Sequence, residues 1–158
     1  MEGTSVASGT SRELEVTVKI EASIEIDKPI ADVWRWYAED HVRNHPRWNP
    51  DLELEQISDG PIGVGTKIRR RNTMGETPVE GEMEVTEFDP PRAMGVSISD
   101  GDTETLGRGT LEERGPERTL LTISADISGL DDPETAQFVK TMMGRSLANM
   151  KTMMEAEI

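Results

Sequence analysis

Apolar and polar residues alternate strictly between residues 14 and 26. The odd positions are polar or charged, and the even, apolar set is Leu14, Val16, Val18, Ile20, Ala22, Ile24 and Ile26. Successive side chains of a β-strand point to opposite faces, so this pattern predicts a strand with one buried and one solvated face. Residues 1–13 are rich in Gly, Ser and Thr and contain no apolar run. They are predicted to be a flexible tail, not a secretory signal.

Two short helices are predicted after this strand. Asp27 and Pro29 are typical of a helix start. One helical stripe is then formed by Ile30, Val33, Trp34 and Tyr37. A second helix is expected from His41 to about Asn44. It should end at Pro46, because the residue before a proline disfavours helical angles.

The middle of the chain, residues 52–128, alternates β-rich runs with short turn signals. The turn signals are Asp59-Gly60-Pro61, Gly75-Glu76, Asp89-Pro90-Pro91, Asp100-Gly101 and Gly115-Pro116. Such spacing predicts an antiparallel meander. In two of its strands the inward residues are expected to be Val79, Gly81, Met83 and Val85, and Leu121, Ile123, Ala125 and Ile127.

A long helix is predicted to close the chain. Asp132 can cap it, Pro133 suits its first turn and Glu134 suits the positive end of its dipole. The helix should run to about Glu155. Its apolar residues recur three or four apart, so one side is expected to lie on the sheet: Val139, Met142, Met143, Leu147, Met150, Met153 and Met154.

Four segments, taken with the order of the predicted elements, carry a family resemblance. They are Ile26-Asp27-Lys28-Pro29 with Val33-Trp34, then His45-Pro46-Arg47-Trp48-Asn49-Pro50, then Gly60-Pro61-Ile62-Gly63-Val64-Gly65-Thr66, and Glu84-Val85-Thr86-Glu87-Phe88-Asp89-Pro90-Pro91-Arg92. Over about residues 14–155 the chain resembles the SRPBCC (START-like, helix-grip) superfamily, and within it the polyketide cyclase/dehydrase-like branch.

The resemblance implies an α+β fold of the helix-grip type. A curved antiparallel sheet of about seven strands would wrap around the long C-terminal helix, with two short helices after the first strand, in one ligand-binding domain spanning residues 14–158. It also implies a cavity between sheet and helix, which the superfamily uses for lipids, sterols, polyketides, plant hormones and aromatic substrates. A shared fold does not fix one reaction, so function must be argued from the residues that line the cavity.

Charge and composition exclude several classes of function. The chain has 17 basic and 31 acidic side chains, a net charge of -14, which repels nucleic acid and anionic membrane surfaces. No apolar run is long enough to cross a bilayer, so no membrane insertion is expected. The chain has no cysteine, which fits a cytoplasmic protein and removes thiolate chemistry. No cofactor is expected, and a homodimer is left open.

Motifs with catalytic or metal-binding potential are weak. His41 and His45 stand four apart but lack the glutamate that a zinc protease needs beside the first histidine. One is expected to pack near the helix end and the other to meet solvent. Residues 60–67 approach a phosphate-binding loop, but threonine precedes lysine and a strand follows. No nucleophilic triad is marked, so no metal site and no catalytic residue are assigned.

The predicted cavity walls come from the strands and from the closing helix. Ile68, Arg70 and Asn72 share one face of a strand, so Arg70 is expected to reach inward, paired with a ligand or with an acid such as Glu104 or Glu112. Arg108 is a similar candidate. The apolar candidates are Met83, Val85, Met94, Val96, Ile98, Val139, Met142, Met143, Leu147 and Met150, with Trp34, Tyr37 and Trp48 at the cavity end.

These residues favour a binding protein for a small hydrophobic or aromatic molecule, lipid-like or polyketide-like, that carries one anionic or carbonyl group. Apolar walls would supply affinity, and Arg70 with Asn72 would orient the ligand. One alternative is an enzyme of the polyketide cyclase or aromatase kind, in which an arginine polarises a carbonyl and water or Tyr37 passes protons. The other is a module that binds another protein. An enzyme should bring together two or more titratable groups, whereas a carrier needs one anchor.

Overall fold

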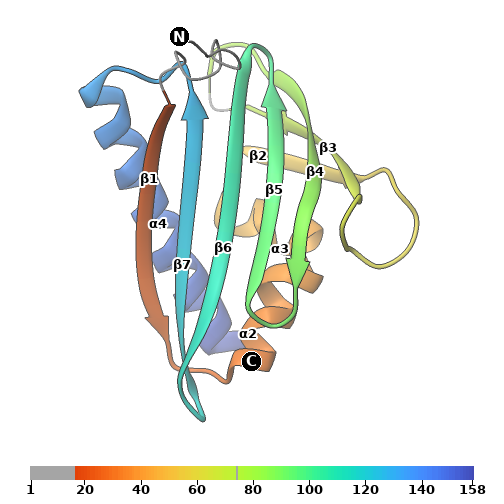
Figure 1. Ribbon diagram of the computed structural model, residues 1–158, viewed down its shortest axis with the longest axis vertical. Coiled ribbons are helices and arrows are strands. Elements are labelled where there is room, and N and C mark those ends of the chain that lie inside the picture. The colour runs from red at the N-terminus through yellow and green to blue at the C-terminus, as the bar shows by residue number, and fades with distance from the viewer. Residues whose placement is uncertain (1–16, 74) are drawn as a thin grey trace, which may run out of the picture.

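Seven antiparallel strands form one sheet in the computed structural model, which describes residues 17–73 and 75–158. The strands are β1 (Thr17–Ile26), β2 (Leu52–Gln56), β3 (Lys67–Asn72), β4 (Val79–Asp89), β5 (Ala93–Asp100), β6 (Thr103–Gly115) and β7 (Arg118–Ser128). Their spatial order is β1-β7-β6-β5-β4-β3-β2, so the first strand pairs with the last (Figure 1). The predicted tail and the strand positions 14–16 lie outside the described residues.

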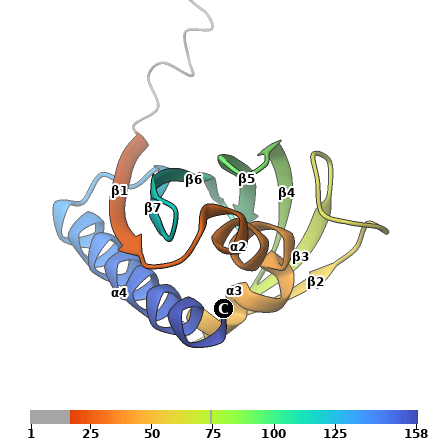
Figure 2. The ribbon, with the colours of Figure 1, turned by 90° about the horizontal axis from the view of Figure 1, so that it is seen from below.

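The helices all lie on one side of this sheet. They are α2 (Ile30–Trp34), the π-helical turn η1 (Arg35–Glu39), α3 (His41–Trp48) and α4 (Pro133–Glu157). Figure 2 shows the sheet curving around them, with α4 along the β1 side and α2 and α3 beneath the middle. The predicted helix-grip arrangement of a curved seven-stranded sheet and a long C-terminal helix is confirmed.

Helix α3 corrects the prediction that Pro46 ends the second helix. The helix continues through Pro46 to Trp48, and the amide of Asn49 still bonds the carbonyl of His45 at 3.0 Å. Proline removes one backbone donor from the helix interior, which normally breaks it. Here Trp48 is buried and stacks on the ring of Trp36 at 5.5 Å between centroids, so tertiary packing holds the last turn in place.

Helix α4 begins as predicted. The side chain of Asp132 accepts a hydrogen bond from the amide of Glu134 at 3.2 Å and another from the Thr135 hydroxyl at 2.7 Å. Both bonds hold the pKa of Asp132 below its usual value, and the bond from Thr135 has the larger effect. An N-cap of this kind satisfies amides that the first helical turn leaves without partners.

The two halves of α4 pack differently. Its buried residues are Leu147, Met150 and Met154, all in the second half, whereas no side chain from 133 to 146 is fully buried. The three buried residues belong to one apolar core with Val33, Trp34, Trp36 and Leu121. The second half is therefore the part of α4 that completes the core.

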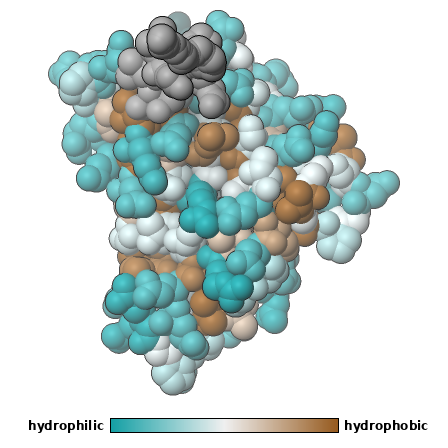
Figure 3. Space-filling model, viewed as in Figure 1, coloured by the Kyte–Doolittle hydropathy of each residue, from teal (hydrophilic) through white to brown (hydrophobic). Residues whose placement is uncertain are grey.

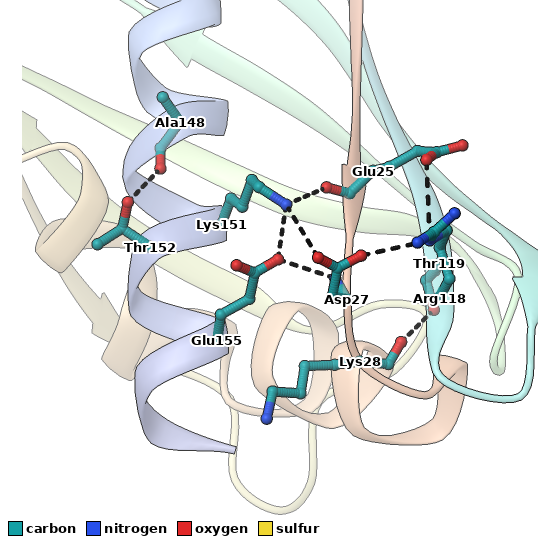
Figure 4. Close-up of polar contacts among 9 residues, drawn as sticks. All are labelled: Glu25, Asp27, Lys28, Arg118, Thr119, Ala148, Lys151, Thr152 and Glu155. Carbon is teal, nitrogen blue, oxygen red and sulfur yellow. Dashed lines mark hydrogen bonds and ion pairs between the residues drawn. The ribbon is translucent and has the colours of Figure 1, made fainter.

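Charged groups fix the second half of α4 to the end of β1 (Figure 4). The ammonium of Lys151 donates to the Glu25 carbonyl at 2.8 Å and to Glu155 at 2.6 Å. Glu155 also accepts the backbone amide of Asp27 at 2.8 Å. Arg118 on β7 reaches the Asp27 carboxylate at 3.3 Å. One network of hydrogen bonds and ion pairs thus joins the end of β1, the second half of α4 and the start of β7.

The last turn of α4 is attached to the π-helical turn and to α3. Glu157 accepts the indole N–H of Trp36 at 3.0 Å and forms an ion pair with Arg47. The hydrogen bonds from Arg47 and then Trp36 lower the pKa of Glu157 to about 2. The C-terminal end of α4 is therefore held on two sides.

The outer face of the sheet is mostly hydrophilic, with apolar side chains in small separated groups (Figure 3). The inner face is the apolar one, as the alternation predicts: Ile68, Val85 and Leu121 are fully buried. Among the described residues, no helix is long and apolar enough to cross a membrane.

We predict that the two halves of α4 respond differently to truncation. Leu147→Ala should lower the free energy of unfolding by about 2–5 kcal/mol, because it opens a void in the core. Val139→Ala should cost about 1 kcal/mol or less, because Val139 is only partly buried and already borders empty space. Urea unfolding followed by circular dichroism measures both, and equal losses would contradict the asymmetric packing.

Candidate functional site

A cavity of about 260 Å³ lies between the inner face of the sheet, α3 and α4. Its walls are Met83 on β4, Met94, Val96 and Ile98 on β5, Thr105, Gly107 and Arg108 on β6, Ile123, Ser124 and Ala125 on β7, Tyr37, His41, His45, Trp48 and Asn49 in the helical segment, and Val139, Met142, Met143, Ser146, Leu147 and Met150 on α4. Side chains of the first half of α4 form one wall, which is why they remain only partly buried.

Most of the cavity-lining candidates named from the sequence border this space. They are Met83, Met94, Val96, Ile98, Arg108, Val139, Met142, Met143, Leu147 and Met150, together with Tyr37 and Trp48 at the cavity end. Strand alternation and the helical stripe are local signals, and in the structure the residues that they select face the interior. That these residues contact a ligand stays a prediction.

Five other candidates do not line the cavity: Arg70, described below, and four more. Ile68 and Val85 are fully buried in the core and do not line the cavity. Trp34 packs against Phe88 at 5.2 Å between ring centroids, away from the cavity wall. Asn72 is half-buried at the end of β3 and does not line the cavity either. An inward-facing position on the sheet therefore does not by itself place a residue in the cavity wall, because the sheet extends beyond the cavity.

Arg70 faces inward as expected but is held by the protein. It is 7% exposed, and its guanidinium makes a two-pronged contact with the Asp100 carboxylate at 2.9 to 3.1 Å. The partner is Asp100, not Glu104 or Glu112. Gly81 on β4 is paired with Arg70 on β3 and with Asp100 on β5, so the two charged side chains lie on either side of this glycine. A Cβ on Gly81 would overlap the Asp100 carboxylate. The pair is therefore formed across a glycine, and Arg70 does not line the cavity.

Arg108 forms a second pair of the same design on the outer face. Its guanidinium bonds Glu87 at 2.8 Å across Gly95, and its side chain is 51% exposed. The bond holds the pKa of Glu87 below its usual value. Arg108 contributes to the cavity wall, but its charge is engaged on the other side of the sheet.

Aromatic rings and two histidines cluster around Trp48 at one end of the cavity. Trp48 stacks on His45 at 4.7 Å and on Tyr37 at 6.0 Å, and His41 meets its ring edge-on at 5.5 Å. His41 is buried, and His45 is half-buried and borders the cavity. The expectation that one histidine packs near the helix end fits His41, and His45 keeps part of its surface exposed.

The two histidines form a hydrogen-bonded relay. Nδ1 of His41 is 2.9 Å from the backbone carbonyl of Tyr37, and Nε2 of His41 is 3.0 Å from Nδ1 of His45. A carbonyl only accepts, so Nδ1 of His41 carries the proton. In a neutral ring Nε2 of His41 then accepts, and Nδ1 of His45 donates to it. Nε2 of His45 is left as an acceptor.

Burial keeps both imidazoles uncharged. Loss of water lowers the pKa of His41 to about 4, assisted by the nearby charge of Arg70. The pKa of His45 lies well below its usual value, first because of burial and then because of His41 and Arg70. Burial also raises the pKa of the Tyr37 hydroxyl, which stays protonated. No group of three or more metal-ligating side chains occurs among the described residues.

Sequence reasoning missed the histidines as cavity residues, although a signal existed. Tyr37, His41 and His45 are spaced four apart, which places them on one face of a continuous helix. The prediction that the second helix ends before Pro46 left His45 outside the helix, so it was not assigned to the same face as Tyr37 and His41. The small residues Thr105, Gly107, Ser124 and Ser146 were also missed, because nothing in their type marks a cavity wall.

The fold and the cavity define the class of this protein as a helix-grip fold of the Bet v 1-like kind. The chain belongs to the family described as polyketide cyclase / dehydrase and lipid transport, whose model matches residues 17–155. The predicted superfamily is thereby confirmed. Comparison with curated protein sequences gives no match.

Solved structures of low sequence identity share this fold. Ara h 8.0201 superposes with a TM-score of 0.71 at 15% identity, covering 90% of this chain and 100% of that one. The ZhuI aromatase/cyclase from Streptomyces sp. R1128 gives 0.71 at 15% identity, with 89% and 94% covered. Norcoclaurine synthase from Thalictrum flavum, in complex with dopamine and hydroxybenzaldehyde, gives 0.69 at 18%, with 98% and 95% covered. At such identities these likenesses bear on the fold alone.

We predict that Gly81→Ala separates Arg70 from Asp100. The added methyl group would overlap both the Asp100 carboxylate and the backbone carbonyl of Ser99, so it displaces the partner of a nearly buried guanidinium and strains the pairing of β4 with β5, which should cost at least about 3 kcal/mol of stability. Asp100→Asn should show a similar loss without the steric change. Chemical unfolding of both variants measures this, and a neutral Asp100→Asn would show that the ion pair contributes nothing.

We predict that stability falls with acidification through the histidine range. The folded-state pKa of His41 is about 4, against 6.5 unfolded, so between these values only the unfolded chain takes up the proton. The contribution is complete above about pH 6.5 and is lost as the pH falls through 4, amounting to roughly 3 kcal/mol. A His41→Phe variant should show a flatter pH profile of unfolding over this window. Parallel profiles would contradict the assignment.

Proposed function

We propose that this protein binds a small, mainly apolar molecule in the cavity between the sheet and α4. The observation that carries the proposal is the composition of the walls. Methionine, valine, isoleucine and leucine side chains from β4, β5, β7 and α4 surround about 260 Å³ of space, and the helical segment adds the polar side chains of Tyr37, His41 and His45. Sites for small molecules are typically concave and apolar with a few placed polar groups.

The size of the cavity favours a compact ligand. Small-molecule sites commonly span ~300–1,000 Å³, and this cavity of about 260 Å³ is slightly smaller than that range. A ligand of two or three fused rings fits this volume better than an extended lipid chain. The flexible side chains of Met83, Met94, Met142, Met143 and Met150 can adapt to such a ligand, since thioethers are polarisable and rotate easily.

A catalytic role as a polyketide cyclase or aromatase is the second candidate. Tyr37, His41 and His45 bring three titratable side chains to one end of the cavity, which meets the criterion that separates an enzyme from a simple carrier. The neutral Nε2 of His45 is an acceptor for an acidic proton, and the Tyr37 hydroxyl can donate to a carbonyl oxygen. The test is cyclisation of a poly-β-keto chain by the wild type and its loss in His45→Phe.

The absence of cysteine from the sequence and the net charge of -14 support a cytoplasmic setting without nucleic acid as a partner.

Binding of a neutral apolar dye tests the primary proposal. N-phenyl-1-naphthylamine should gain fluorescence on entering the cavity of the wild-type protein. Ala125→Phe adds a ring to the cavity wall and should weaken binding by at least about tenfold. Asp126→Phe places the same ring on the outer face of the same strand and is the matched control. No dye binding by the wild type, or equal binding by both variants, would contradict the proposal.

A further inference from the structure

The relay of histidines ends on an atom without a protein partner. Nδ1 of His45 is engaged by His41, and no contact with a described residue satisfies Nε2. Nε2 is also not sealed in the core, because the only buried side-chain nitrogen or oxygen without a partner among the described residues is Nε1 of Trp34. His45 is also one of the residues that border the cavity.

The hydroxyl of Tyr37 likewise has no hydrogen-bond partner among the described residues. Tyr37 is only 5% exposed, and its hydroxyl lies so close to β6 that a Cβ on Gly109 would overlap it. No described residue forms a hydrogen bond with this hydroxyl, and the hydroxyl oxygen is not among the fully buried atoms that lack a partner. The hydroxyl is therefore accessible from the cavity that Tyr37 lines. Both residues stack on Trp48, so the two groups belong to one end of the cavity.

We infer that this end of the cavity recognises a neutral hydroxyl group of the ligand, of the phenol or enol type, which donates to Nε2 of His45 and accepts from the hydroxyl of Tyr37. The inference rests on the proposed binding function and names the chemistry of its ligand. His41 is a positioning residue, because its contact with the Tyr37 carbonyl fixes which nitrogen of His45 lacks a proton.

The charges around the site disfavour an anionic ligand. Arg70, whose charge acts on both histidines, is paired with Asp100, and Arg108 is paired with Glu87 on the outer face. A bare imidazole nitrogen repels a carboxylate, and no unpaired cation of the described part lines the cavity. A carboxylate would therefore lose its water without gaining a partner.

A series of naphthalene derivatives tests the inference on the unaltered protein at neutral pH. The probes are naphthalene, 2-methoxynaphthalene, 2-naphthol and 2-naphthoate, and affinity is measured by calorimetry or tryptophan fluorescence. The naphthol should bind about fivefold more tightly than the methyl ether, which retains the acceptor oxygen but cannot donate to His45. The naphthoate should bind most weakly.

The outcomes separate the inference from the proposed function. If naphthalene and its ether bind and the naphthol gains nothing, or the naphthoate binds best, the cavity is a binding site and the hydroxyl recognition is wrong. If none of the four binds, the proposed function itself fails.

Two variants that keep an aromatic ring dissect the site. His45→Phe should bring the ratio of naphthol affinity to methyl-ether affinity from about five to about one. Tyr37→Phe should weaken the naphthol and the ether by the same factor, because both keep the acceptor oxygen, so their affinity ratio should stay at about five. Loss of the naphthol advantage in Tyr37→Phe with no change in His45→Phe would overturn the assigned roles.

The tautomer can be read directly by nitrogen NMR. The chain has two histidines, so an untagged, ¹⁵N-histidine-labelled sample gives a simple spectrum. Both rings should be protonated at Nδ1 and bare at Nε2 at neutral pH, and 2-naphthol should shift the Nε2 signal of His45 more than the methyl ether does. A proton on Nε2 of free His45 would overturn the inference.

Discussion

The structure depends on how α4 is held. Only its second half is packed into the core, through Leu147, Met150 and Met154. The same half is bonded to β1 through Lys151 and Glu155. Because this end is fixed on several sides, the first half can extend along the sheet without filling the space beneath it. An evenly packed helix of this length would have closed the interior.

The interior is neutral although the protein is strongly acidic. Two arginines of the sheet, Arg70 and Arg108, are each paired with a carboxylate across a glycine of the intervening strand, Gly81 for Arg70 and Gly95 for Arg108. The histidines are kept uncharged by burial and by the field of Arg70. Among the described residues, the polar end of the cavity therefore offers hydrogen-bonding groups and no unpaired charge.

The fold could be predicted from the sequence because its signals are local. A period of two placed Met83, Met94 and Val96 on the inner face, and a helical stripe with an Asp132 cap placed α4. The partners of the polar residues could not be predicted, since they depend on strand register. Asp100 reads as part of a turn, and only the pairing of β4 with both neighbours puts it beside Arg70.

The histidine site was hidden for a related reason. A proline at position 46 predicts the end of a helix, and the rule holds when nothing else supports the turn. Here the stacking of Trp48 on Trp36 and His45 outweighs one missing backbone bond. Tertiary packing overrode a local preference, and single-sequence reasoning has no access to that balance.

The π-helical turn at residues 35–39 sets the orientation of all that follows it in this segment. Its bond from the amide of Asp40 to the carbonyl of Arg35 at 2.9 Å encloses one residue more than an α-helical turn does. Deleting a single residue here would restore an ordinary helix and rotate α3 by about 100° relative to Trp34. Both imidazoles would then leave the hollow while the sheet stayed as it is. Members of this family that differ by one residue at this turn should therefore differ in what their interiors accept, even where every wall residue of the sheet is the same.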